Sequence, residues 1–423
     1  MLDIKFIREN VELVKESVKN RGMNIDINEI IRLDEERRRL MVEVQELKHK
    51  HNKQNDEIAQ ILKEKKNPKE LIDNMKRLSQ EISILDIEVG KIEQNIDNIG
   101  SLIPNIQHKS LPIGGPEANK IVRTWGDIKK HNFNTRNHLE LSEILGIIDF
   151  GLAAKITGRG FSCFFGSGAR LERALINFML DLHTKKHGYK EVFPPFLVNR
   201  ESMIGTGQLP RLEGDMYQLK DDDLFLVPTA EVPVTNLLRN EVIDEKDLPV
   251  CYTAYTACFR REAGSYGQKT QGLIRVHQFD KVELVKFVKP DRSYDELESL
   301  VKDAEEVIQL LELPYRVVLL STGELSFAAS MCYDIELHAP GSKTYLEVSS
   351  CSNFTDFQAR RMSIRFKPQD GQKPAYVHTL NGSGVALARL VVAILENFQN
   401  EDGSVTLPRA IVPYMDGMTV LRP

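Results

Sequence analysis

The sequence predicts an α+β protein, with a long antiparallel coiled-coil hairpin followed by a domain built on a mostly antiparallel sheet with flanking helices. Two observations support this prediction. Apolar residues between positions 71 and 103 recur at alternating intervals of four and three, the spacing of a coiled coil. Further along, residues 247–287 and 314–352 alternate between apolar and polar side chains with the period of strands.

The predicted hairpin occupies about residues 28–103 of an N-terminal domain that we place at residues 1–105. Its first helix is the less regular one, since His51 and Gln54 stand where apolar residues are expected. Asn67-Pro68 separates the helices, and proline suits the first turn of a new helix. At about 1.5 Å per residue, each helix would extend roughly 50 Å. The seam of the second helix is Leu71, Met75, Leu78, Ile82, Leu85, Val89, Ile92, Ile96, Ile99 and Ile103.

The distal half of this hairpin is basic, although the chain as a whole is acidic. The formal net charge is -5, so any binding of RNA must depend on a local surface. Such a tip suits contact with a phosphate backbone, and a packing or dimerisation element is the plainer alternative. The basic residues are Lys48, Lys50, Lys53, Lys63, Lys65, Lys66 and Lys69, against Asp56, Glu57 and Glu64.

Composition indicates a globular protein of a reducing compartment. Of the 423 residues, 41% are hydrophobic, which allows a substantial core. We expect a cytoplasmic protein without a membrane segment, because no run of about eighteen apolar residues occurs and the N-terminal residues lack the apolar core of a signal peptide. Free thiols are expected, because no Cys-x-x-Cys pair occurs among Cys163, Cys251, Cys258, Cys332 and Cys351.

A second domain is placed at residues 106–423, and its first residues include the proline- and glycine-rich stretch 111–116, which marks the domain boundary. Apolar residues between Leu171 and Leu182 predict a helix that stops at Gly188. The residues that follow, 189–198, include Pro194-Pro195 and are expected to form an edge strand, because proline cannot donate a hydrogen bond within a central one.

Residues 259–287 contain the most informative pattern. Two strand-like runs flank a turn that begins Phe259-Arg-Arg-Glu-Ala-Gly264, so a hairpin is expected. A phosphate-cradling loop is rejected here, because Gln268 interrupts the Gly-Lys pair and a strand follows instead of a helix. The hairpin would bring charged and aromatic groups into one cavity suited to a ligand with a phosphate, a flat base and an ammonium group. These groups belong to Arg260, Glu262, Arg275, Phe279 and Glu283.

This segment resembles the second signature motif of class II aminoacyl-tRNA synthetases, in the form found in bacterial-type seryl-tRNA synthetases. The resemblance covers nearly the whole chain and implies a class II synthetase domain that activates L-serine with ATP to seryl-adenylate. Serine would then pass to tRNA(Ser), along whose long variable arm the hairpin would lie, and similar enzymes also charge tRNA(Sec). The first motif, near Pro194-Pro195, implies a homodimer. Further matching segments are residues 205–210, 229–231, 347–354 and 379–389.

The resemblance also implies the roles of individual residues. Arg260 and Arg389 are the catalytic candidates: Arg260 would bridge the serine carboxylate and the α-phosphate, and Arg389 would stack on adenine or hold the γ-phosphate. Phe279 would stack on the other face of adenine, and Glu262 would hold its amino group or orient Arg260. The ATP site would comprise Arg260, Arg261, Glu262, Phe279, Glu347, Val348, Ser349, Ser350 and Arg389, with Mg²⁺ placed by Glu347 and Ser350. The serine site would comprise Thr229, Ala230, Glu231, Glu283, Asn381 and Ser383.

Arg389 is the candidate that physical reasoning selects on its own. It lies in residues 385–397, a predicted helix that is apolar nearly all round, where a charge must be paired or face a ligand. Without the resemblance, Phe279 would be assigned to the core and the Arg260–Glu262 pair to a surface salt bridge. The proposed chemistry needs no general base, because serine's carboxylate is already ionised; it needs alignment and charge neutralisation. To reject alanine, the site requires a buried polar group that hydrogen-bonds to the hydroxyl of serine. Either carboxylate, that of Glu231 or that of Glu283, could take the substrate's ammonium group.

No Cys/His cluster has the spacing of zinc ligands, so Mg²⁺ is the expected metal and no zinc is expected. Relatives commonly have a basic residue just before the glycine that closes the second motif's loop, whereas this chain has Gln271, with Lys269 nearby.

Two alternatives to the function of a seryl-tRNA synthetase remain. A ligase that charges a carrier protein would lack the arm, and an inactive paralogue should have lost at least one of the main site residues, which are all present.

Overall fold

The computed structural model describes residues 2–263 and 272–423, so Gln268, Lys269 and Gln271 lie outside it. The chain divides into two compact units, Met1–Pro104 and Asn105–Pro423. This division falls next to the boundary expected at residues 105 and 106. Within the described ranges, no helix combines the length and the apolar character that a membrane crossing requires.

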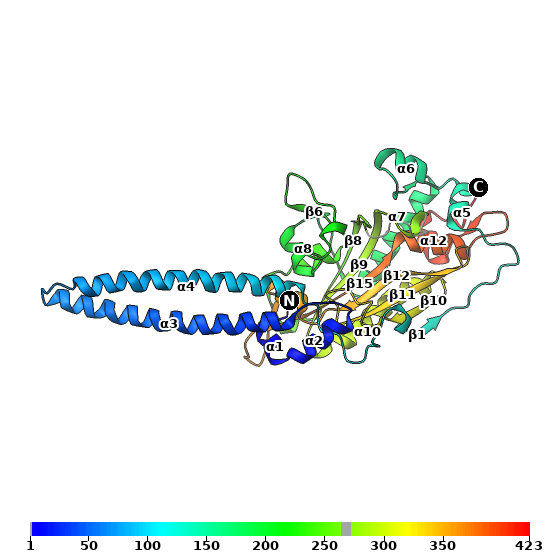
Figure 1. Ribbon diagram of the computed structural model, residues 1–423. Helices are drawn as coiled ribbons and strands as arrows, with labels where there is room; N and C mark the ends of the chain where they lie inside the picture. The colour runs from blue at the N-terminus through cyan, green and yellow to red at the C-terminus, as the bar shows by residue number, and fades with distance from the viewer. Residues whose placement is uncertain (1, 264–271) are drawn as a thin grey trace. The chain divides into compact units, whose positions relative to one another are not determined.

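Unit 1 consists of two short helices and a long helical hairpin. The short helices are α1 (Ile4–Glu9) and α2 (Val11–Asn20), and the hairpin pairs α3 (Ile27–Lys63) with α4 (Lys69–Leu102), side by side in Figure 1. Between residues 71 and 99, the residues that are not exposed are the predicted seam positions and no others. Where His51 replaces an apolar seam residue, its Nε2 lies 3.1 Å from Ser79 Oγ on the other helix. The predicted coiled-coil hairpin is confirmed.

A buried carboxylate joins the base of the arm to the first helix. Asp34 of α3 has no exposed side-chain surface. Its carboxylate oxygens lie 2.7 Å from an Arg8 nitrogen, 2.9 Å from Arg37 and 3.3 Å from Arg38. Three guanidiniums around one buried carboxylate supply the pairing that a charge in a low-dielectric position requires.

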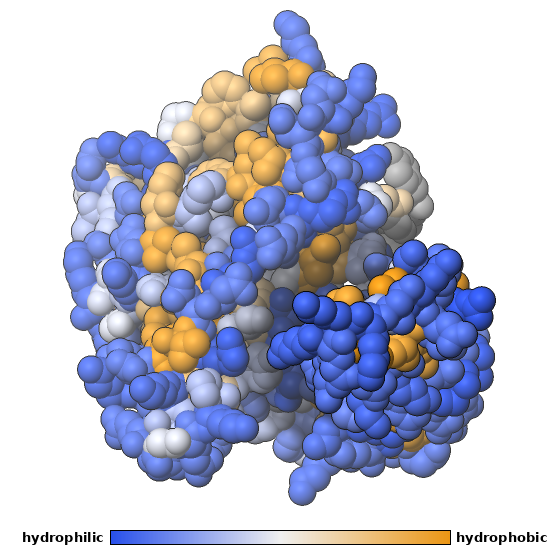
Figure 2. All heavy atoms as spheres, turned by 90° about the vertical axis from the view of Figure 1, so that its left-hand side faces the viewer, coloured by the Kyte–Doolittle hydropathy of each residue, from blue (hydrophilic) through white to orange (hydrophobic). Residues whose placement is uncertain are grey.

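The arm tip is polar and carries exposed lysines. All seven lysines between positions 48 and 69 are exposed. Lys66 pairs with Glu64, and Lys48 pairs with Asp86 across the hairpin. In Figure 2, where the end of the arm faces the viewer, hydrophilic residues predominate on it, with a few hydrophobic side chains between them.

Unit 2 is built on an eight-stranded sheet in the order β1-β10-β11-β12-β15-β9-β8-β4. Neighbouring strands run antiparallel, apart from the parallel pair of β4 and β8. The predicted mostly antiparallel sheet is therefore confirmed (Figure 1). The strands are β1 (Lys120–Trp125), β4 (Lys190–Glu191), β8 (Val250–Phe259), β9 (Gln278–Val288), β10 (Tyr315–Leu319), β11 (Met331–Ala339), β12 (Thr344–Asn353) and β15 (His378–Ala386).

Three helices complete the core around this sheet. The predicted helix near residue 171 is α7 (Ser167–Lys185), whose Leu171 and Leu175 are fully buried. Helix α10 (Ser293–Leu310) packs on β12 and β15, and α12 (Leu387–Asn397) packs on β9, β11 and β12. Buried residues of all three helices join the sheet in one hydrophobic cluster.

The expected edge strand at residues 189–198 is shorter than predicted. Strand β4 ends at Glu191, before Pro194-Pro195, and β5 (Leu197–Asn199) starts after them and pairs with β6 (Leu224–Leu226). Two consecutive prolines lack the N–H groups that would continue a ladder.

The remaining elements are α5 (His138–Leu145), β2 (Ile148–Asp149), α6 (Phe150–Thr157), β3 (Cys163–Phe164), α8 (Arg200–Thr206), α9 (Glu231–Asn236), β7 (Val242–Asp244), α11 (Phe357–Met362), β13 (Arg365–Lys367), β14 (Ala375–Tyr376), β16 (Val405–Thr406), β17 (Val420–Leu421) and the 3₁₀ turns η1 (Pro116–Ala118), η2 (Glu213–Asp215), η3 (Glu245–Asp247), η4 (Gly272–Ile274), η5 (Pro290–Arg292) and η6 (Arg409–Met415).

Candidate active site

A cavity of about 730 Å³ opens in unit 2 above the central strands of the sheet. Its walls come from β9, β12 and β15, from the start of α12 and from the segments around residues 206–216 and 326–328. Phe279, Lys281 and Glu283 all line it, because side chains two residues apart on β9 share one face of the sheet. Within this cavity the charged groups fall into two sets, one around Arg260 and Arg389 and the other around Glu231 and Glu283.

At one end, an arginine lies over an aromatic ring. The Arg260 guanidinium carbon is 5.3 Å from the centre of the Phe279 ring, and its Nε donates to the Pro228 carbonyl at 3.3 Å. The ring holds a cation over its face. Next to them, Arg275 Nε lies 3.2 Å from a carboxylate oxygen of Glu262. The predicted hairpin thus brings these four side chains into one cavity wall.

Arg389 projects from α12 into the same end of the cavity. Every other residue of α12 is buried, and the Arg389 side chain alone is partly exposed, at 30%. Its Nε donates to the Ile274 carbonyl at 3.1 Å, and a terminal nitrogen donates to the Glu347 carbonyl at 2.7 Å. These two bonds fix the plane of the guanidinium and leave its charge facing the cavity. The expectation that this charge would be paired or face a ligand agrees with the geometry.

Oxygen atoms of Glu347 and Ser350 lie together at the cavity edge. Ser350 Oγ is 3.1 Å from a Glu347 carboxylate oxygen and donates to Asp334 Oδ1 at 2.6 Å. Burial, and then the nearby charge of Glu347, raise the pKa of Asp334 to about 8. The described part of the chain holds no group of three or more His, Cys, Asp or Glu side chains arranged to bind a metal. Mg²⁺, however, is usually held by one or two carboxylates together with substrate phosphates, so the hard oxygen donors here fit it.

The other end of the cavity is a buried polar cluster. Thr229 Oγ1 donates to a Glu283 carboxylate oxygen at 3.0 Å and accepts from Lys281 Nζ at 2.8 Å. The Lys281 ammonium also pairs directly with the Glu283 carboxylate. Side-chain exposure is only 7% for Lys281 and 2% for Glu283. A buried ion pair of this kind requires further hydrogen bonds, and Thr229 provides one to each partner.

Glu231 is a second buried carboxylate in this cluster. Gln358 Nε2 donates to it at 2.7 Å, and Gln358 Oε1 in turn accepts from Thr379. Burial, and then repulsion from the Glu283 charge, raise the pKa of Glu231 to about 7. A bound ammonium group would relieve both effects, so this end of the cavity is suited to an amine.

Most of the residues expected at the site meet in this cavity. Three do not line it: Ala230 is buried in a hydrophobic cluster, Arg261 is exposed, and Ser349 is buried with its Oγ donating to the Ser383 carbonyl at 2.6 Å. The expected residues that line the cavity are Thr229, Glu231, Arg260, Glu262, Phe279, Glu283, Glu347, Val348, Ser350, Asn381, Ser383 and Arg389.

Lys281, Asp334 and Gln358 are residues of this site that did not emerge from the sequence. Lys281 stands in a strand that is buried nearly throughout, and its spacing of two from Glu283 was a usable signal, because it places both charges on one face. Asp334 is paired with Ser350 across β11 and β12, which only the sheet register reveals.

Comparison with known proteins gives a consistent picture. Residues 1–107 match the family described as seryl-tRNA synthetase N-terminal domain, and residues 215–398 match the tRNA synthetase class II core domain (G, H, P, S and T). A serine–tRNA ligase of Carboxydothermus hydrogenoformans is 55% identical, with 98% of each chain covered. One of Acetivibrio thermocellus is 53% identical, with 100% of each chain covered.

The solved structures agree. A crystal structure of seryl-tRNA synthetase from Pyrococcus horikoshii complexed with ATP matches with a TM-score of 0.94 and 39% identity, covering 100% of both chains. One of the cytoplasmic serine–tRNA ligase from Naegleria fowleri in complex with AMP matches with a TM-score of 0.88 and 28% identity, covering 100% of this chain and 99% of that one. The resemblance that the motifs suggested is therefore confirmed: this chain belongs to the seryl-tRNA synthetase family of class II aminoacyl-tRNA synthetases.

Proposed function

We propose that the cavity of unit 2 binds ATP and L-serine end to end, forms seryl-adenylate and transfers serine to tRNA(Ser). The overall reaction is that of a serine–tRNA ligase, the activity named for relatives 55% identical over nearly the whole chain. The observation that carries the assignment of the site is the division of one cavity into two chemically different ends. One end combines arginines with an aromatic ring, and the other combines buried carboxylates with hydroxyl and amide groups.

The arginine end suits ATP. Phe279 offers a flat surface for adenine, while Arg260 and Arg389 supply the positive charge that the triphosphate requires. The reaction joins serine's carboxylate to the α-phosphorus and releases diphosphate. Both reactants are anions, so guanidiniums held in place before the reaction favour its transition state by aligning them and offsetting their charge.

The carboxylate end suits serine. Glu231 and Glu283 would face the ammonium group of serine. Polar atoms of Thr229, Asn381 and Ser383 lie within the same walls. Alanine would leave a buried polar group without a partner, which is the strong form of discrimination. Exclusion of threonine depends instead on the lack of space around its methyl group.

Glu347 and Ser350 are the residues that would hold Mg²⁺. When bound there, the ion would neutralise negative charge between the phosphates of ATP. Asp334 would keep the Ser350 hydroxyl turned so that its free lone pairs face the cavity.

The RNA partner and the assembly are parts of the same proposal. The exposed lysines of the arm tip would contact the backbone of the long variable arm of tRNA(Ser), and of tRNA(Sec) where the host has one. A cytoplasmic homodimer is proposed on the family pattern. A large apolar side chain of the first motif supports it, since Phe193, next to Pro194-Pro195, is 77% exposed.

The direct test is serine-dependent exchange of labelled diphosphate into ATP in the absence of tRNA. We expect exchange with serine but not with alanine or glycine, and a loss of orders of magnitude in Arg260→Ala. The matched control is Arg316→Ala, which removes an arginine that pairs with Glu336 outside the cavity and should leave exchange intact. A folded wild type that gives no exchange would leave RNA binding without catalysis as the better account.

A further inference from the structure

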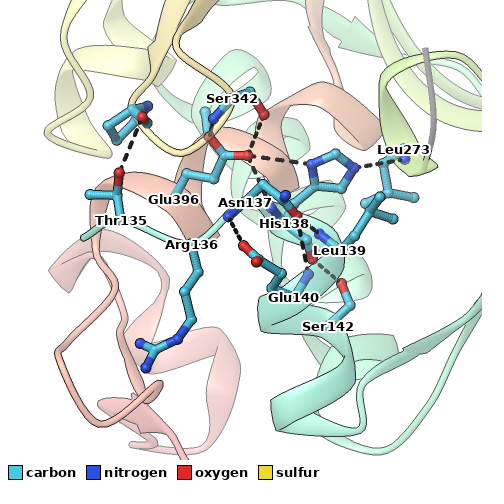
Figure 3. A network of polar contacts seen from close by, with 12 residues as sticks. Thr135, Arg136, Asn137, His138, Leu139, Glu140, Ser142, Leu273, Ser342 and Glu396 are labelled. Atoms are coloured by element: carbon cyan, nitrogen blue, oxygen red, sulfur yellow. Dashed lines mark hydrogen bonds and ion pairs between the residues drawn. The ribbon is translucent and has the colours of Figure 1, made fainter. Parts of the chain in front are cut away.

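A buried histidine lies directly behind the ATP end of the cavity. His138, the first residue of α5, is 3% exposed, and nothing in the sequence pattern marked it as part of the site. Its Nε2 accepts from the backbone N–H of Leu273 at 3.3 Å, and its Nδ1 lies 3.3 Å from Glu396 Oε1 near the end of α12. Figure 3 shows the ring between these two partners.

The roles of the two ring nitrogens follow from their partners. The Leu273 N–H can only donate, so Nε2 must accept and Nδ1 carries the hydrogen, which it donates to Glu396. The Glu396 carboxylate also accepts from the His138 N–H at 3.0 Å and from the Ser342 N–H at 2.8 Å and Oγ at 2.6 Å. Burial alone would raise the pKa of Glu396, but these hydrogen bonds outweigh it and the pKa is lowered.

The chain on both sides of His138 is held in place as well. Asn137 caps α5 in a capping box with Glu140, and Gln399 makes two bonds to the backbone of Arg136, at 2.8 and 3.0 Å. The ring therefore has little freedom to turn away from Leu273. Space around it is also restricted, since a Cβ at Gly272 (φ +71°) would come within 2.2 Å of Nε2.

Leu273 and Ile274 form the wall that holds Arg389. Both line the cavity in the short turn η4, and the Ile274 carbonyl accepts from Arg389 Nε at 3.1 Å. The turn is thus bonded on one side to His138 and on the other to the arginine. Displacement of the Leu273–Ile274 segment would move the Ile274 carbonyl, one of the two backbone carbonyls that set the plane of that guanidinium.

We infer that His138 is a positioning residue for adenylate formation: by holding the Leu273 N–H, it fixes the Ile274 carbonyl and so the orientation of Arg389 toward ATP. The inference rests on the proposed function of the cavity. It predicts an effect on ATP rather than on serine, because the serine end is formed by residues outside α5, η4 and α12. These residues are Thr229, Glu231, Glu283, Asn381 and Ser383.

Two substitutions separate the two bonds of the ring. The amide of His138→Asn can still donate to Glu396 but is too short to reach Leu273, whereas the oxygen of His138→Gln can reach the Leu273 N–H. In diphosphate exchange, we expect His138→Asn to lower kcat/KM for ATP about tenfold, the ratio that corresponds to one lost hydrogen bond. We expect the KM for serine to stay within about twofold, and His138→Gln to recover most of the loss.

The control is His378→Ala, which removes another poorly exposed histidine whose Nδ1 lies 2.9 Å from Ser293 Oγ, away from the cavity. It should lower the melting temperature without changing the kinetics for ATP. Equal kcat/KM for ATP in wild type and His138→Asn would overturn the inference. So would a KM for serine that rises as much as the kcat/KM for ATP falls, or a His138→Gln variant whose kcat/KM for ATP is no higher than that of His138→Asn. Absence of exchange in the wild type would instead refute the proposed function itself.

Discussion

The buried carboxylate Glu231 predicts a pH dependence of serine binding. Its pKa is raised to about 7 by burial and then by repulsion from Glu283. A substrate ammonium needs the ionised form, which is about a tenth of the sites at pH 6 and about nine-tenths at pH 8. We therefore expect kcat/KM for serine to rise about tenfold between these two pH values.

The assay is diphosphate exchange at subsaturating serine, measured from about pH 5.5 to 8.5. At saturating serine the step should move to lower pH, because the bound ammonium favours the carboxylate. Glu231→Gln should be much less active, and its residual kcat/KM for serine should lack the step near pH 7. A wild-type profile that is flat between pH 6 and 8, or a step that survives in the glutamine variant, would refute the reasoning.

The same shift has a consequence for stability in the absence of serine. The pKa of Glu231 is above its ordinary value in the folded state, so folding takes up a proton between about pH 4.5 and 7. The stabilisation is complete below this window and is lost as pH rises through about 7, up to about 3 kcal/mol for a group so buried. Thermal unfolding of wild type and Glu231→Gln across this range measures the difference.

Three further predictions concern other parts of the chain. Arg389→Lys should lower the exchange rate by about 100-fold, because an ammonium cannot keep both carbonyl bonds and still present a planar fork to ATP; single-turnover kinetics would show the defect. Asp34→Asn should destabilise the chain by about 3 kcal/mol, since it leaves three guanidiniums without their carboxylate; urea unfolding measures this, while exchange should be unchanged. Replacing Lys63 and Lys65 by alanine should raise the KM for tRNA and leave the KM values for ATP and serine unchanged. Each lysine–phosphate ion pair removed in this way should reduce the slope of log affinity for tRNA against log salt concentration by about 0.8. An unchanged slope would show that these lysines do not contact the RNA.

The arm and the sheet were predictable because their signals are local. The seam residues between Leu71 and Ile99 repeat within a single helix, and the strands alternate within a few residues, so burial in the folded state follows the sequence pattern directly. Arg389 could be selected for a similar reason, since an isolated charge in an apolar helix has few explanations.

Other parts of the site depend on residues distant in sequence. His138 and Glu396 are 258 positions apart, and each alone has an ordinary structural interpretation. Lys281 pairs with Glu283 of the same strand, but Thr229, which bonds to both, comes from a segment 52 positions away from Lys281. The expected edge strand was too long because the residues around Pro194-Pro195 lie next to the sheet without joining its ladder.

Strand β9 carries the base-binding and the amino-acid-binding ends of the proposed site on one stretch of backbone. Phe279 and Glu283 are four residues apart, about 13 Å along an antiparallel strand. The separation of the two ligand ends is therefore set by the extended backbone of one strand. A one-residue insertion between these positions would turn one of the two side chains to the opposite face of the sheet. A change of amino-acid preference that keeps this spacing would therefore exchange side chains at constant strand length.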